Sequence, residues 1–157
     1  IMELAKSGML PAAKALRLLN MPDVASVVEE VEVDILEAAK QNLMMSKGQY
    51  ASVEVWQDHV AHLDEHDNFK KREEYQHLSE QVKAMFKYHD FQHLQQLAML
   101  FNLMPPQTPP TPETMLQMQQ NPTYVDPVLE FQLRQVFIQL KSGTAGAGPT
   151  EPQGSPQ

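Results

Sequence analysis

The 157-residue sequence predicts an all-α fold, and three observations support this class. Apolar residues recur at spacings of three and four over long stretches, which is the period of an amphipathic helix. Glycine and proline punctuate the ends of the longer stretches, where helices start and stop. No segment alternates in the strict two-residue period of a half-buried strand. We therefore predict a series of helices and no sheet.

The first helices are delimited by proline, a polar cap and glycine. Pro11 occupies a position where a first-turn proline is tolerated, so a helix is expected over residues 12–19. Asp23 is suited to the N-cap of a long acidic helix that ends near Lys47, with Gly48 as the residue after it. The predicted apolar face of this helix consists of Val24, Val27, Val28, Val31, Ile35, Ala38, Leu43 and Met44.

Two further helices follow a short connector. Residues 50–56 form the connector, in which two valines favour a brief extended segment. Residues 57–77 predict a polar helix with a break near Asp67-Asn68. Residues 79–102 predict a long helix, whose stripe consists of Val82, Met85, Phe86, His89, His93, Leu97 and Leu100.

Proline divides the chain near Met104, because ten of the twelve prolines lie between Pro105 and Pro156. The last amphipathic helix should open at Asp126-Pro127. Because the chain begins in helical sequence without an initiator methionine, we expect it to be part of a longer polypeptide. The predicted regions are a helical region over 1–103, a Pro/Gln/Met-rich linker over 104–125, a C-terminal amphipathic helix over 126–142 and a disordered tail over 143–157.

Composition excludes several classes of protein. Without cysteine, the chain has no disulfide framework, no thiolate zinc site and no cysteine nucleophile. The formal net charge of −8 argues against tight sequence-specific DNA binding, because phosphate neutralisation supplies most of such affinity. No run approaches the roughly 18 apolar residues of a membrane span, so we expect no membrane partner.

Histidines crowd the start of the polar helix, in the sequence Asp58-His59-Val60-Ala61-His62-Leu63-Asp64-Glu65-His66. The three imidazoles fall on one helical face, at i, i+3 and i+7. Neighbouring carboxylates could accept hydrogen bonds from these rings, along one helix or between helices. The preferred interpretation is therefore structural, with Asp58, His59, His62 and His66 as interface or packing residues.

The paired histidines also allow a metal site. An i, i+4 pair of imidazoles can chelate one ion, so His62 with His66 and His89 with His93 would make a four-nitrogen site on two packed helices. His62 to His66 also matches the H-x-x-E-H pattern of one metalloprotease class. Such enzymes need a further carboxylate ligand and a sheet-containing fold, and no sheet is predicted. We therefore predict no catalytic residues, no bound metal and no cofactor.

Several segments follow one another in a characteristic order. A short helix precedes Gly8-Met9-Leu10-Pro11, and a second ends at Leu18-Leu19-Asn20-Met21-Pro22-Asp23. A long acidic helix then ends in Met44-Met45-Ser46-Lys47-Gly48, and a connector leads to the histidine-rich run. This order resembles the C-terminal region of tailed-bacteriophage portal proteins. The resemblance covers about residues 1–103, and the sequence beyond Met104 departs from it.

The resemblance implies a non-enzymatic structural role. A portal subunit assembles into a ring, of twelve copies in this family, through which double-stranded DNA passes non-specifically during packaging and ejection. The expected partners are other copies of the chain, a terminase that does the ATPase work, capsid proteins and head-completion or adaptor proteins. The expected location is the portal vertex of the virion, after assembly in the host cytoplasm. His89 and His93 would then be structural or interface residues, like Asp58, His59, His62 and His66.

Two alternatives remain open from the sequence. The first is a metal-binding helical protein that uses the paired histidines. The second is a helical scaffolding or adaptor protein that docks the amphipathic segment 127–141 into a partner's groove.

Overall fold

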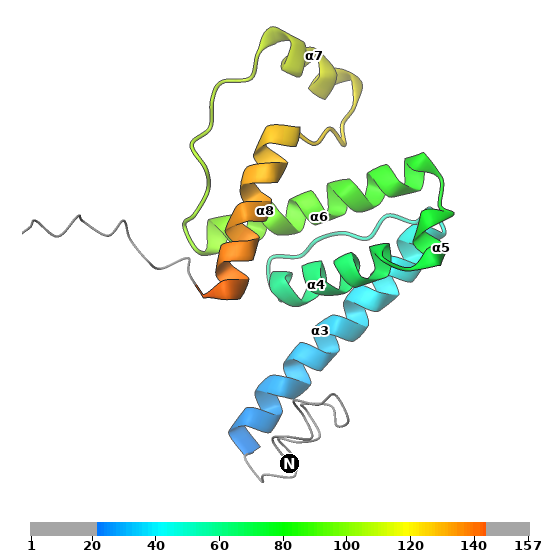
Figure 1. Ribbon diagram of the computed structural model, residues 1–157, viewed down its shortest axis with the longest axis vertical. Coiled ribbons are helices and arrows are strands. Elements are labelled where there is room, and N and C mark those ends of the chain that lie inside the picture. Colours follow the sequence, from blue (N-terminus) through cyan, green and yellow to red (C-terminus); the bar gives the residue numbers. More distant parts are fainter. Residues whose placement is uncertain (1–21, 144–157) are drawn as a thin grey trace, which may run out of the picture. The chain divides into compact units, whose positions relative to one another are not determined.

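The computed structural model describes residues 22–143, with side chains from Glu29 onward. This part of the chain is all-α, as predicted, and it contains no strand. The helix expected over residues 12–19 and the tail beyond Gly143 lie outside the described residues. Within them, no helix is long and apolar enough to cross a membrane. The helices are α3 (Pro22–Ser46), α4 (His59–Lys70), α5 (Glu73–Gln76), α6 (Glu80–Leu100), α7 (Pro112–Gln120) and α8 (Pro127–Ser142) (Figure 1).

The described part of the chain divides into two compact units, residues 22–86 and residues 87–143. Unit 1 contains α3, α4, α5 and the first turns of α6. Unit 2 contains the rest of α6 together with α7 and α8. Each unit is described by itself.

In unit 1, α3 and α4 run in the same direction. The backbone N–H of Asp58 donates to Asp34 Oδ1, and His66 Nδ1 lies 2.7 Å from Asn42 Oδ1. Both pairs are separated by 24 residues, so the two helices advance together. The connector over 47–58 must therefore run back along α3 for about 18 Å before α4 begins. Its fully extended length of about 40 Å easily allows this. It contains no strand.

The ends of α3 and α4 follow from local chemistry. Gly48 has φ +81°, and the N–H of Gln49 donates to Met44 O, so α3 ends at the predicted glycine. The predicted break near Asp67-Asn68 lies three residues too early, because α4 continues to Lys70 and α5 begins at Glu73. Lysine ammonium groups lie 3.4 Å from the side-chain oxygens of both Asp67 and Asn68, so these oxygens do not compete for backbone groups.

A small aromatic core closes the C-terminal ends of α3 and α4. Phe69 and Phe86 stack with centroids 5.5 Å apart, and Tyr75 meets Phe86 edge-on at 5.4 Å. Met45 and Ala51 are buried with the two phenylalanines, and Leu78, Val82 and Met85 pack around them. The predicted stripe of α6 therefore has its first members in this core.

The predicted apolar face of α3 is wrong in part. Val31, Ile35 and Leu43 are exposed, although Ala38 is buried as expected. The side of α3 that faces α4 is instead partly polar, because it also carries the buried Gln41 and Asn42. Period alone identifies a helix, but it does not fix which of two adjacent faces the neighbour covers.

Unit 2 begins with the second half of α6, where Leu97 and the histidines are buried as predicted but Leu100 is exposed. The helix α8 begins after Asp126, whose carboxylate accepts from the N–H of Val128, and it ends at Gly143 with φ +72°. Both ends match the prediction. The helix α7 lies inside the segment expected to be a linker, because Thr111 caps it and Pro112 occupies a first-turn position.

Candidate functional site

The interface between α3 and α4 is built from buried polar pairs. His62 Nδ1 lies 3.1 Å from Gln41 Oε1, and His66 Nδ1 lies 2.7 Å from Asn42 Oδ1. All four residues are buried. An amide oxygen only accepts, so each imidazole donates its Nδ1–H. In the neutral ring, Nε2 then carries the lone pair.

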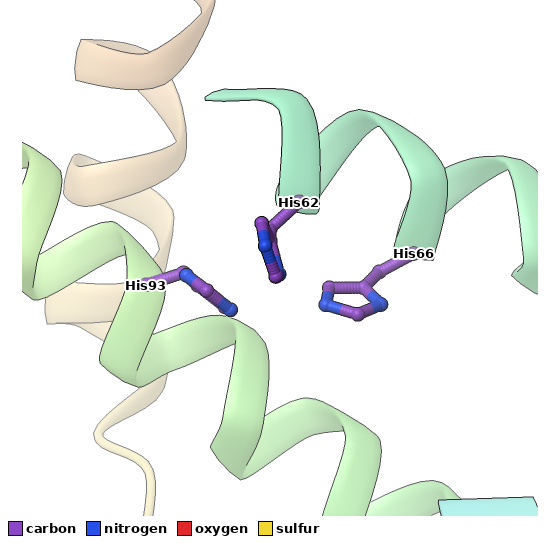
Figure 2. A group of neighbouring side chains, drawn as sticks. All are labelled: His62, His66 and His93. Carbon is purple, nitrogen blue, oxygen red and sulfur yellow. The ribbon is translucent and has the colours of Figure 1, made fainter. Parts of the chain in front are cut away.

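The two α4 histidines project from successive turns of the helix. Figure 2 shows the rings of His62 and His66 on the same side of α4, and it also shows His93, which comes from α6. The His62 and His66 rings meet edge to face, with centroids 5.8 Å apart. The i, i+4 spacing therefore produces the shared face that the sequence predicts.

Carboxylates from α3 lie beside His62. Its Nε2 is 3.4 Å from Asp34 Oδ1, within ion-pair range but longer than a well-formed hydrogen bond. Glu37 lies one turn further along α3, and its Oε1 accepts a hydrogen bond from Gln57 Nε2. Ligand atoms of Asp34, Glu37 and His62 all lie within 4.8 Å of one another. These three side chains could hold a metal ion.

Burial favours the neutral form of the α4 histidines. Desolvation lowers the pKa of His62 below its ordinary value of 6.5, although the charges of Asp34 and Glu37 partly oppose this effect. Desolvation also lowers the pKa of His59, and the charge of His62 acts in the same direction. Both rings are therefore neutral at pH 7, which is the protonation state that binds metals.

Unit 2 has its own buried histidine pair. The Nε2 atoms of His89 and His93 are 3.2 Å apart, and both side chains are fully buried. One Nε2 must donate and the other accept, so the two rings hold complementary tautomers. Next to His89, the buried carboxylate of Asp90 accepts from Arg134 of α8 at 3.0 Å.

The predicted site residues therefore fall into two groups. His59, His62 and His66 are buried on α4 in unit 1, whereas His89 and His93 are buried on α6 in unit 2. Asp58 is the N-cap of α4, where its carboxylate accepts from the N–H of Ala61. The four-nitrogen metal site stays a prediction.

Sequence reasoning missed the partners that α3 supplies. Asp34, Glu37 and Gln41 follow one another at i, i+3 and i+7, which places them on one helical face. That spacing matches the spacing of the three histidines on α4 and could have suggested a paired polar interface. The partners expected for the histidines were carboxylates, but His66 bonds to the amide of Asn42.

The α3–α4 interface thus presents neutral imidazoles, side-chain amides and two carboxylates, a set suited to fixing register or holding a cation. No family model matches the chain, and comparison with curated proteins and with solved structures finds no match.

Proposed function

We propose that the chain is a structural subunit of a bacteriophage portal ring. The observation that carries the proposal is a row of exposed apolar side chains on α3. Val33, Leu36 and Leu43 each leave more than half of their surface exposed, and their spacing places them on one side of the helix. Together with the buried polar face, this row suits a helix that meets another copy of the chain.

The geometry of a ring supports this use of the row. A head-to-tail interface joins two different surfaces of neighbouring copies, so each subunit needs an apolar patch that its own fold leaves uncovered. The connector adds to the uncovered surface, because Val55 and Trp56 are exposed in unit 1. The order of sequence features from residue 1 to about 103 resembles that of portal proteins, and this resemblance is the reason for proposing a portal ring.

The acidic balance suits a conduit for DNA. The net charge of −8 disfavours tight contacts with phosphates, so double-stranded DNA would slide through without being held. The proposed ring has twelve copies and sits at the capsid vertex, where it works with a terminase, capsid proteins and adaptor proteins. No catalysis by this chain is proposed.

A second candidate function is supported by α8. Val128, Phe131 and Ile138 are exposed on this helix, whereas Leu133 and Phe137 on its other side are buried. An exposed apolar row on an amphipathic helix suits docking into a partner's groove, as a scaffolding or adaptor protein would do.

Deletion of residues 104–157 separates the two functions. The oligomeric mass of the full-length protein and of the truncated protein is measured by light scattering. Rings that survive the deletion support the portal subunit. Loss of all partner binding, with no ring at either length, supports the adaptor instead.

A further inference from the structure

We propose that Asp34, Glu37 and His62 form a binding site for one divalent transition metal ion, with zinc as the reference ion. One imidazole and two carboxylates are a ligand set that zinc accepts in proteins. The site lies within unit 1 of a single chain, so it does not depend on ring assembly. It uses no residue of the second histidine pair.

The orientation of His62 suits a ligand. Its Nδ1–H is held by Gln41 Oε1, so the neutral ring turns its Nε2 lone pair toward Asp34. A lone pair and a carboxylate repel each other at close range unless a cation or a proton lies between them. A metal ion satisfies both groups without protonation.

The distances fit a metal between the two helices. Two ligand atoms about 2.1 Å from a tetrahedral zinc ion lie about 3.4 Å from each other. The separation of His62 Nε2 and Asp34 Oδ1 is 3.4 Å. Glu37 offers its carboxylate within 4.8 Å of both, from the next turn of α3. The fourth position is left for water, because Asp34 keeps a side-chain exposure of 21%.

Each ligand is also held by a second group. The backbone N–H of Asp58 donates to Asp34, and Gln57 Nε2 donates to Glu37. Gln57 is itself fixed, because its Oε1 accepts from the N–H of Glu54 and its side chain is buried. Such outer hydrogen bonds orient metal ligands and are costly to remove. For comparison, Glu73 and His77 form an exposed pair 3.6 Å apart, on α5 and at its C-cap, and the described residues show no similar outer hydrogen bond that holds either side chain in place.

The test is a zinc titration of the untagged 157-residue chain in competition with a chromophoric chelator. We expect one zinc ion per chain, at least tenfold weaker binding in Glu37→Gln and in His62→Gln, and about tenfold weaker binding in Gln57→Leu. The matched controls Glu73→Gln and His77→Gln remove the surface pair and should leave the zinc affinity unchanged. Far-UV circular dichroism confirms that each variant is folded.

Two results would overturn the proposal. The first is the absence of stoichiometric zinc binding by the unaltered chain, which would mean that Asp34, Glu37 and His62 do not form a metal site. The second is unchanged zinc affinity in folded Glu37→Gln together with its loss in His89→Gln, which would place the ion on the other histidine pair. The half-buried Glu37 keeps the test decisive if His62→Gln fails to fold.

Discussion

At the scale of single residues, charges and imidazoles are buried only with specific partners. In unit 2 the carboxylate of Asp90 is almost fully buried, and Arg134 of α8 lies 3.0 Å away. In unit 1 the buried imidazoles of His62 and His66 each have an amide oxygen as a partner. When a buried polar group loses its partner, water cannot replace the lost hydrogen bond. These pairs are therefore sensitive to single substitutions.

Removal of Arg134 should destabilise the chain strongly. Arg134→Ala leaves the buried carboxylate of Asp90 without its cation, so we expect the free energy of unfolding to fall by about 3 kcal/mol. The matched control is Lys87→Ala, which breaks the more exposed pair with Glu130 at 3.4 Å and should cost less than about 1 kcal/mol. Urea denaturation followed by circular dichroism measures both. Equal losses would contradict this account of the buried pair.

Acidification should destabilise unit 1. The folded-state pKa values of His59 and His62 are lowered from 6.5, so the unfolded chain binds more protons as the pH falls. The contribution of these two histidines to the free energy of unfolding is therefore fully present above about pH 7.5. It is lost as the pH drops through 6.5 toward their folded-state pKa values, by at most about 1.4 kcal/mol per pH unit for each histidine.

Urea midpoints measured with a chelator at about pH 7.5, 6.5 and 5.5 test this dependence. His59→Gln should flatten the pH dependence, whereas His77→Gln at an exposed position should not alter it. Greater stability at the lower pH would contradict the direction given for both pKa values.

At the scale of elements, three helix ends were predictable and faces were not. The expected N-cap of α3 was wrong, because the helix begins at Pro22 and Asp23 lies inside it. The C-terminal ends of α3 and α8 follow from a glycine with positive φ, and the start of α8 follows from Asp126 and the proline after it. These are local signals. The buried face of α3 depends on the partners that α4 presents, so Gln41 and Asn42 lie inside while Leu43 lies outside. The sequence pattern predicts the helix, but it does not predict which side of that helix packs against α4.

The polar interface was only half predictable for the same reason. The i, i+3, i+7 spacing placed His59, His62 and His66 on one face, and the structure confirms that face. The choice of Asp34 and Asn42 as partners depends on the parallel register of α3 and α4, which the return of the connector sets. No local pattern in the sequence encodes that register.

The N-cap of α8 offers a test at this scale. Asp126→Ala removes the acceptor for the N–H of Val128, which lies 2.9 Å from Asp126 Oδ1. We expect a loss of about 1 kcal/mol in the free energy of unfolding, measured by urea denaturation. Asp126→Asn keeps a capping oxygen and should lose little. A large loss in both variants would assign the effect to the charge and not to the cap.

At the scale of the whole molecule, uncovered apolar rows suggest that the chain works in an assembly. Exposed apolar side chains that gather on one side of a helix can mark an interaction site. Such rows lie on α3 and on α8, in two separate units. The resemblance to portal proteins came from the sequence order alone, and it gives the assembly its proposed form.

Charging the row on α3 should prevent assembly without unfolding the chain. Leu36 is 70% exposed, so Leu36→Lys should change the free energy of unfolding by no more than about 0.5 kcal/mol. It should nevertheless shift the full-length protein from rings to monomers in analytical ultracentrifugation. Gln81→Lys adds the same charge at an exposed position of α6 and is the matched control. Rings that form equally well with Leu36→Lys would exclude this row from the subunit contact.

The most direct test of the portal proposal is electron microscopy of the purified protein. We predict closed rings with a central channel wide enough for double-stranded DNA and with twelve copies around the axis. Monomers or small dimers without a channel would contradict the proposal.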